Sequence, residues 1–353
     1  MKKRIVVALS GGMDSSFSAY LMLKKGYEVV GLHMDLGLGE VEEGRCCGWQ
    51  AVRSARKVAS FLGIPFYVIN LREKFFQKVI SYFARSYLSG KTPNPCVMCN
   101  RYIKFGELLR KTLEISGEKL VTGHYARMEK LDGRWVIKKG KDTAKDQTYF
   151  LFPLLEKPLD RIEFPLGDWS KEEVRREVLR LGIPAERRES QEVCFLDRGG
   201  LASFFYERMG LSPKPGPVVT REGKVVGEHP GIFFFTLGQR RGLSLRMGEP
   251  YYVVEIIPEE NKIVVGRREE LYSRKVVIGD MLWREGFTPR PGERVEIKVR
   301  YQGDRVPAII ERIDGDRVSF RLLKPLWAVT PGQAGVAYQG EILVGGGWIE
   351  GKE

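Results

Sequence analysis

Apolar and polar positions follow two different rhythms along the chain, and the first occupies residues 1 to about 125. Short, nearly continuous apolar runs are each followed by a longer stretch in which apolar residues recur every three or four positions. This order is typical of βαβ units, which build a parallel sheet. The predicted strands are residues 3–9, 27–34, 65–71 and 119–125, and the predicted helices begin at Met13, Ala51, Glu73 and Arg101.

Residues 126–140 interrupt this rhythm with two alternating runs on either side of an Asp-Gly dipeptide, a pattern that predicts a β-hairpin. A further helix is predicted after Ser170, where Glu173 completes a capping box. Gly182 and Pro184 end that helix.

The second rhythm begins after about residue 210, where Pro and Gly separate short alternating strands. Evenly spaced strands of this kind are typical of β-domains. In the last part of the chain the pattern predicts a small barrel. The strand segments are residues 216–229, 250–266, 276–283, 293–303, 305–323 and 332–349.

Charge and cysteine content narrow the class of protein. A formal net charge of +13 and an isoelectric point near 9.4 favour a polyanionic partner such as nucleic acid. Five cysteines without regular spacing do not resemble a disulfide scaffold and instead suggest thiol chemistry or metal binding in a reducing compartment. No apolar run approaches the roughly 20 residues that span a bilayer, so we expect a cytoplasmic protein with no membrane partner.

Residues 8–16, ALSGGMDSS, join the first predicted strand to the first predicted helix. Residues 10–12 allow close approach of an anion to the free amides of the helix start. Asp14 could hold magnesium, and Ser15 and Ser16 could donate hydroxyls to phosphate. The loop lacks the lysine of the G-x-x-x-x-G-K-[ST] motif, which argues against a γ-phosphate hydrolase of that class. An ordinary turn is the alternative, because Gly-Gly followed by an acidic residue is also common in turns.

Cys96, Cys99 and Cys194 lie in polar, basic segments. The first two precede the helix predicted from Arg101, and a helix start and nearby cations both lower the pKa of a thiol, so we expect a reactive thiolate there. A buried apolar role is the alternative for any one cysteine. Cys-x-x-Cys is also half of a typical zinc site, but no second Cys-x-x-Cys and no matching pair of histidines follows. A thioredoxin-like redox pair is not favoured either, because the motif does not follow a strand at the start of a βαβ unit. The nearby cations are Lys91, Arg101, Lys104, Arg187 and Arg188.

The loop SGGMDSS resembles the signature of the PP-loop ATP pyrophosphatases. Together with seven further segments it resembles the tRNA-specific 2-thiouridylases, the MnmA family, over nearly the whole chain. This resemblance implies an α/β fold. It implies a parallel-sheet PP-loop domain of the adenine nucleotide α-hydrolase-like type over residues 1–205, a small mostly-β central tRNA-binding domain over 206–271, and a C-terminal β-barrel over 272–353. The seven segments are NPCVMCNRYIKFG, VTGHYA, KDQTYFL, SQEVCF, GQRRGL, VRYQ and TPGQA.

The resemblance also implies roles for individual residues. Cys99 matches the catalytic nucleophile, and Cys194 matches the cysteine that carries a persulfide. ATP would be bound by Ala8, Leu9, Ser10, Gly11, Gly12, Met13, Asp14, Ser15, Met34 and Gly123. The target base and tRNA would be contacted by Asn94, Pro95, Cys96, His124, Lys145, Asp146, Gln147, Tyr301, Gln302 and Gln333.

The implied activity is that of a tRNA-uridine 2-sulfurtransferase, with ATP and Mg²⁺ as cofactors. ATP would adenylate the C2 oxygen of the wobble uridine, and the Cys194 persulfide would supply sulfur. A Cys99–Cys194 disulfide would remain for an outside reductant. The implied partners are tRNA and a persulfide-donating sulfur carrier or cysteine desulfurase.

The sequence departs from the family pattern at Cys96, where most members have Asp. Cys96, Cys99 and Cys194 could therefore hold an iron–sulfur cluster instead. Cys46 and Cys47 have no assigned part. Two rival functions remain open: a PP-loop ligase acting on a small molecule, and a non-catalytic RNA-binding protein with a redox or iron–sulfur site.

Overall fold

The computed structural model describes residues 2–38, 49–187, 193–197, 199–243, 245 and 249–351. The amino-terminal part is built on a five-stranded sheet with strand order β3-β2-β1-β4-β7, in which every pair is parallel. The central strands are buried on both faces, which explains their continuous apolar runs. The strands are β1 (Arg4–Ala8), β2 (Glu28–Asp35), β3 (Phe66–Asn70), β4 (Lys119–Val121) and β7 (Ile162–Glu163).

Helices cover both faces of this sheet. On one face, Ile5 and Val7 of β1 share a hydrophobic cluster with residues of α1 (Met13–Lys24), α2 (Trp49–Leu62) and α7 (Lys171–Arg180). Val6 points to the opposite face, because side chains alternate along a strand. The capping box predicted at Ser170 is present at the start of α7.

The cysteine-bearing helix begins earlier than predicted. It starts with α5 (Pro95–Met98), continues as a π-helical stretch from Cys99 to Leu108, and ends with α6 (Leu109–Glu114). Asn94 caps it, since its side-chain oxygen accepts a hydrogen bond from the Val97 amide at 3.3 Å. A capping Asn followed by Pro at the first helical position is a strong start signal, so the prediction of a start at Arg101 is wrong. Both Cys96 and Cys99 therefore lie inside the helix.

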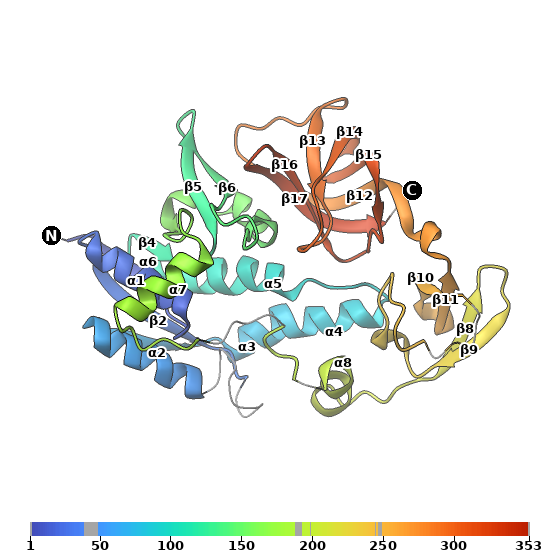
Figure 1. Ribbon diagram of the computed structural model, residues 1–353, viewed down its shortest axis with the longest axis horizontal. Coiled ribbons are helices and arrows are strands. Elements are labelled where there is room, and N and C mark those ends of the chain that lie inside the picture. The colour runs from blue at the N-terminus through green and yellow to red at the C-terminus, as the bar shows by residue number, and fades with distance from the viewer. Residues whose placement is uncertain are drawn as a thin grey trace.

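Six antiparallel strands form the C-terminal barrel, which closes where β12 pairs with β17. The predicted hairpin of β5 and β6 is confirmed, and it extends the barrel sheet by pairing Lys138 with Ile342. Figure 1 shows this hairpin beside the barrel. The strands are β5 (Ala126–Leu131), β6 (Arg134–Lys139), β12 (Tyr272–Trp283), β13 (Arg294–Lys298), β14 (Val306–Asp314), β15 (Arg317–Trp327), β16 (Ala334–Gln339) and β17 (Ile342–Gly351).

A small central unit carries a four-stranded sheet of order β10-β11-β8-β9. The predicted fold class, an α/β parallel-sheet domain followed by a small β-rich domain and a β-barrel, is confirmed. The strands are β8 (Gly216–Thr220), β9 (Val225–His229), β10 (Tyr252–Ile257) and β11 (Lys262–Gly266), and the remaining helices are α3 (Arg72–Phe75), α4 (Ser81–Leu88) and α8 (Gly200–Ser203). Short helical turns span Phe76–Ile80, Thr148–Phe150, Phe152–Glu156, Leu159–Arg161, Phe204–Arg208, Ile232–Phe234, Pro258–Glu260 and Arg268–Leu271.

The barrel holds the loop that precedes the cysteine-bearing helix. Gln333 donates from Nε2 to the carbonyls of Thr92 and Pro93 at 3.1 and 3.0 Å. The Thr92 amide donates in turn to the carbonyl of Pro331 at 2.9 Å. Figure 1 shows the helices labelled α4 and α5 running below the barrel. We call residues 331–333 together with residues 92–93 the barrel clamp.

No helix within the described residues is both long enough and apolar enough to cross a membrane. The predicted domain boundaries at residues 205/206 and 271/272 and the cytoplasmic location stay predictions.

Gly332→Ala should loosen the barrel clamp. Gly332 has a φ of +87°, and an added Cβ would lie 2.9 Å from the Thr92 carbonyl oxygen. We expect amide hydrogen exchange over residues 91–98 to become at least about tenfold faster, equivalent to roughly 1.4 kcal/mol. Gly340→Ala is the matched control, because Gly340 also has a positive φ of +57° but open space around it. Equal exchange over residues 91–98 in the two variants would contradict a clamp.

Candidate functional site

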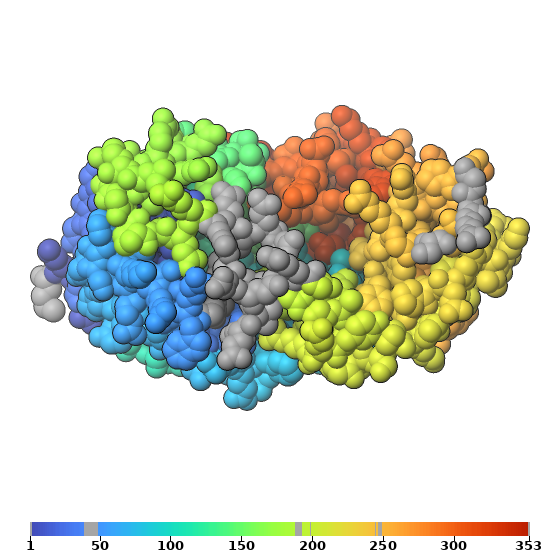
Figure 2. Space-filling view, turned by 60° about the horizontal axis from the view of Figure 1, so that its bottom comes forward, coloured from blue at the N-terminus to red at the C-terminus, as the bar shows by residue number. Residues whose placement is uncertain are grey.

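One cavity of about 580 Å³ collects residues from the sheet edge, the cysteine-bearing helix, the segment around Cys194 and the barrel. The space-filling view shows the surface hollowed where the amino-terminal part meets the barrel and the central unit (Figure 2). The predicted site residues that line the cavity are Ala8, Leu9, Ser10, Met34, Asn94, Pro95, Cys96, Cys99, His124, Gln147, Cys194, Tyr301 and Gln333. Those that do not line it are Gly11, Gly12, Met13, Asp14, Ser15, Gly123, Lys145, Asp146 and Gln302.

The phosphate loop is braced by its own serines. Ser15 and Ser16 donate their hydroxyls to the carbonyl of Gly12, at 3.1 and 2.8 Å. Ser16 is completely buried, so in this structure its hydroxyl supports the helix start and does not face a ligand. Gly11 has a φ of +88°, and an added Cβ would lie 2.7 Å from the Ala55 amide nitrogen. The loop is therefore fixed between α1 and α2 and leads into the amino end of the 12-residue helix α1. Binding of a phosphate there stays a prediction.

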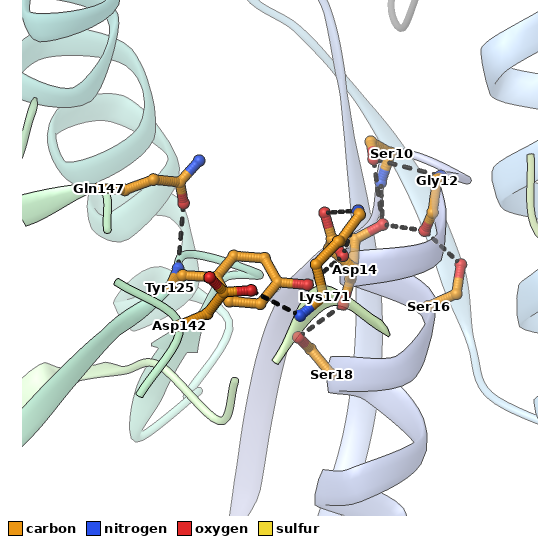
Figure 3. Close-up of polar contacts among 10 residues, drawn as sticks. Ser10, Gly12, Asp14, Ser16, Ser18, Tyr125, Asp142, Gln147 and Lys171 are labelled. Carbon is orange, nitrogen blue, oxygen red and sulfur yellow. Dashed lines mark hydrogen bonds and ion pairs between the residues drawn. The ribbon is translucent and has the colours of Figure 1, made fainter. Parts of the chain in front are cut away.

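Asp14 is held by a cation that the sequence did not reveal. Both carboxylate oxygens accept from Lys171 Nζ at 2.8 Å, and one also accepts from the Tyr125 hydroxyl at 2.8 Å (Figure 3). Lys171 is the first residue of α7, where its amide donates to Asp142 at 2.9 Å. Lys171 thus comes from a helix far along the chain, and its ammonium pairs with Asp14 beside the loop.

Gly123 packs closely against the start of the same helix, α1. An added Cβ at Gly123 would lie 2.9 Å from the Asp14 carbonyl carbon and 3.1 Å from the Ser15 amide nitrogen. A glycine is needed here for close packing, and that packing joins the end of β4 to the phosphate loop. A contact of Gly123 with ATP stays a prediction.

Burial governs the acidity of the thiols in the cysteine-bearing helix. Cys96 is exposed, but toward the cavity, and Cys99 is half-buried. Loss of surrounding water raises the pKa of both thiols, to about 11 for Cys99, while the charge of Lys104 lowers the pKa of each. The prediction that the helix start and nearby cations produce a thiolate is therefore wrong for this state, because desolvation outweighs the nearby charge.

His124 is fixed as a neutral imidazole. Its Nε2 lies 3.5 Å from Lys104 Nζ and its Nδ1 lies 2.7 Å from the Thr122 hydroxyl. An ammonium group can only donate, so Nε2 is the acceptor and Nδ1 carries the proton. Burial and then the charge of Lys104 hold the pKa of His124 well below its usual value.

Cys194 reaches the cavity from the other side. It packs in the same hydrophobic cluster as Cys99, next to Phe195, whose ring contacts Phe83 with centroids 5.0 Å apart. Arg208 lies within electrostatic range of Cys194 and donates to the Phe195 carbonyl at 3.4 Å. The sequence pointed to Arg187 and Arg188, and no motif indicated Arg208. Arg188, Cys46 and Cys47 lie outside the described residues.

The predicted tRNA contacts divide into cavity, interior and surface positions. Tyr301 faces Phe150, with ring centroids 4.5 Å apart. Asp146 is buried, pairs with Arg305 at 3.3 Å and accepts from Thr148, which gives it a structural role. Lys145 is half-buried and Gln302 is exposed. Contact of these residues with tRNA stays a prediction.

The three described cysteines are free thiols. Within the described part of the chain, no group of three His, Cys, Asp or Glu residues lies close enough to hold a metal ion. Cys96, Cys99 and Cys194 are all described, so their arrangement in this structure does not fit a three-thiolate cluster site.

Family profiles match almost the whole chain. The tRNA methyl transferase HUP domain matches residues 3–198, the tRNA methyl transferase PRC-barrel domain matches residues 204–267, and the aminomethyltransferase beta-barrel domain matches residues 273–349. The three matches follow the order of the amino-terminal part, the central unit and the barrel.

Curated relatives match over their full length. The chain is 44% identical to the tRNA-specific 2-thiouridylase MnmA of Carboxydothermus hydrogenoformans, covering 99% of this chain and 98% of that protein. It is 43% identical to MnmA of Moorella thermoacetica, covering 98% and 99%. It is 41% identical to MnmA 1 of Caldanaerobacter subterraneus, covering 100% and 99%.

Lys104→Met should slow alkylation of Cys99 by iodoacetamide. Lys104 favours the thiolate, so its removal should raise the pKa of Cys99 further and reduce the rate at pH 9 about tenfold, one pKa unit. Mass spectrometry of the modified peptides measures the rate. Lys111→Met is the control, because Lys111 pairs with Glu114 on the surface of the same helix. Unchanged or faster alkylation in Lys104→Met would show that Lys104 does not act on this thiol.

Proposed function

Because the chain belongs to the tRNA-specific 2-thiouridylase family, MnmA, we propose that it uses ATP to replace the C2 oxygen of a wobble uridine in tRNA by sulfur. The observation that carries this proposal is one shared cavity. It joins the end of β1 at the phosphate loop to Met34 and to both Cys99 and Cys194. An activated base and the sulfur-bearing residues can therefore meet in one cavity.

The phosphate loop would hold the triphosphate of ATP at the start of α1. The C2 oxygen of the uridine attacks the α-phosphorus as N3 loses its proton to solvent, pyrophosphate leaves, and the adenylated oxygen becomes a good leaving group. N3 regains a proton from solvent once sulfur has replaced the oxygen. A Mg²⁺ ion would offset the charge of the departing pyrophosphate. Asp14 fits an ion that keeps phosphate and water ligands, since it offers a single carboxylate beside the loop. Lys171 would have to share or release that carboxylate.

Sulfur would come from a persulfide on Cys194. Its terminal sulfur bonds to C2, and Cys99 attacks the Cys194 sulfur, which breaks the persulfide S–S bond as AMP departs. The products are thiolated tRNA and a transient Cys99–Cys194 disulfide, which an outside dithiol reduces. Arg208 stabilises the anionic persulfide by its charge. We propose a sulfur carrier or cysteine desulfurase as the donor of the persulfide.

The raised pKa of Cys99 gives this residue a defined resting state. At neutral pH it is a thiol, the less nucleophilic form. Attack on the Cys194 sulfur needs the thiolate, so Lys104, the nearby cation that lowers the pKa of Cys99, supports this step. Cys99 would thus be a weak nucleophile in the resting protein.

The alternatives have less support. The iron–sulfur route needs Cys96, Cys99 and Cys194 as joint ligands, and the described residues contain no such group. A small-molecule ligase would leave the central unit and the barrel without a function, although family profiles match both.

Cys99→Ser and Cys194→Ser should each lower tRNA thiolation by about 10³-fold or more, because each removes one sulfur of the relay. Both variants should still release pyrophosphate in the presence of ATP and tRNA, since adenylation precedes sulfur transfer. Nucleoside mass spectrometry measures 2-thiouridine, and a coupled assay measures pyrophosphate. Cys96→Ser is the control and should keep most of the activity. Thiolation by both Cys99→Ser and Cys194→Ser would show the relay to be wrong. Loss in Cys96→Ser together with stoichiometric iron in anaerobically purified protein would favour the cluster.

Asp14→Asn should lower tRNA-dependent pyrophosphate release by about 10²-fold, the usual scale for losing one group that stabilises transition-state charge. Its binding of tRNA should not change. Asp168→Asn is the control, because Asp168 is an exposed carboxylate just ahead of α7. Normal pyrophosphate release by Asp14→Asn would remove Asp14 from the magnesium site.

A further inference from the structure

Asn100 carries a buried carbonyl oxygen without a hydrogen-bond partner. The residue follows Cys99, is 2% exposed and lines the cavity. Its Nδ2 donates to the Phe150 carbonyl at 3.0 Å, which fixes the orientation of the amide because a carbonyl can only accept. The other end, Oδ1, is buried and unpaired. Such a group is costly to leave unpaired, and the cavity that Asn100 lines gives a ligand a place from which to supply the missing donor.

Gln147 presents the complementary group to the same cavity. Its Oε1 accepts from the Tyr125 amide at 3.0 Å, which commits the oxygen to the protein. Figure 3 shows the side-chain nitrogen of Gln147 pointing away from Tyr125. Gln147 also lines the cavity, as Asn100 does, and its nitrogen is the end of the amide left to donate to a ligand.

One short turn holds both amides. Gln147 precedes the helical turn Thr148–Phe150, and the Phe150 amide donates to the Gln147 carbonyl at 3.0 Å. Asn100 is bonded to the carbonyl of the same Phe150. The Phe150 and Tyr301 rings add an aromatic wall to this part of the cavity. Pockets that bind a nucleobase commonly combine an aromatic surface for stacking with a hydrogen-bond acceptor and a donor for the edge of the base.

We propose that Asn100 and Gln147 read the Watson–Crick edge of the flipped uracil, an inference that rests on the proposed function. Asn100 Oδ1 accepts from N3–H, and Gln147 Nε2 donates to O4. Cytosine presents the reverse pattern, an acceptor at N3 beside a donor at N4, so it would set acceptor against acceptor and donor against donor. O2, on the other side of N3, is not engaged by this pair and stays open to adenylation. Asn100 and Gln147 are therefore specificity-determining residues for the base.

The test compares binding of two tRNA anticodon stem-loops that differ in U or C at the wobble position, without ATP. The proteins are the wild type, Asn100→Leu and Gln147→Glu. Gln147→Glu keeps the acceptor for the Tyr125 amide but replaces the donor by an acceptor. Gln50→Glu, an exposed position in α2, controls for the added negative charge near RNA.

We expect the wild type and Gln50→Glu to prefer U over C by about tenfold to a hundredfold, the range for one well-placed base contact. In Asn100→Leu and Gln147→Glu this ratio should fall to within about threefold of unity. A purely structural defect would weaken the binding of both RNAs equally and leave the U-to-C ratio unchanged. An unchanged ratio in both variants would therefore overturn the proposal. Gln147→Glu keeps the test decisive if Asn100→Leu does not fold. A wild type that thiolates no U-containing tRNA would overturn the proposed function as well, whereas an active wild type with unchanged ratios overturns the base-reading role alone.

Discussion

The active cavity depends on the hydrogen bonds by which the C-terminal barrel holds the loop in front of the cysteine-bearing helix. Pro93 and Pro95 have no amide hydrogen, so this loop has few donors of its own and tends to stay extended. Gln333 supplies two donors to its carbonyls, at 3.1 and 3.0 Å. Asn94 then caps the helix from within the loop. The position of Cys96 and Cys99 is thus set by residues more than 200 positions later in the chain.

The electrostatics of the cavity follow from a balance between desolvation and one nearby cation. Burial raises the pKa of Cys99 to about 11 and lowers that of His124, so both groups are uncharged at neutral pH. The charge of Lys104 lowers the pKa of both groups. It therefore favours the thiolate of Cys99 and the neutral ring of His124. A charge has a stronger effect where water is excluded. A substrate that fills the cavity excludes further water, which strengthens the effect of Lys104 and also adds to the desolvation that raises the pKa of Cys99.

Local patterns in the sequence predicted most of the fold but only part of the site. Strand runs, the hairpin turn and the capping box at Ser170 are short-range signals, and each is confirmed. The helix start was predicted at Arg101, although Asn94 followed by Pro95 is itself a start signal. Lys171 could not be found, because nothing near it in sequence shows that α7 packs beside Asp14. The thiol acidity was predicted wrongly for the same reason, since burial is a property of the folded chain.

The cysteine-bearing helix carries both the cysteines and Asn100, the residue that we propose recognises the base. Cys96 and Cys99 are three positions apart and both line the cavity, and Asn100 follows directly in the π-helical stretch. A widened helical turn of this kind is common at functional sites, where it redirects side chains without breaking the helix. Because one helical segment carries these groups, a base that did not pair with Asn100, the proposed contact, would also be wrongly placed relative to the cysteines. Under the proposed role of Asn100, recognition of N3–H and access to the neighbouring C2 become a single geometric condition, and cytosine would be rejected before sulfur is transferred.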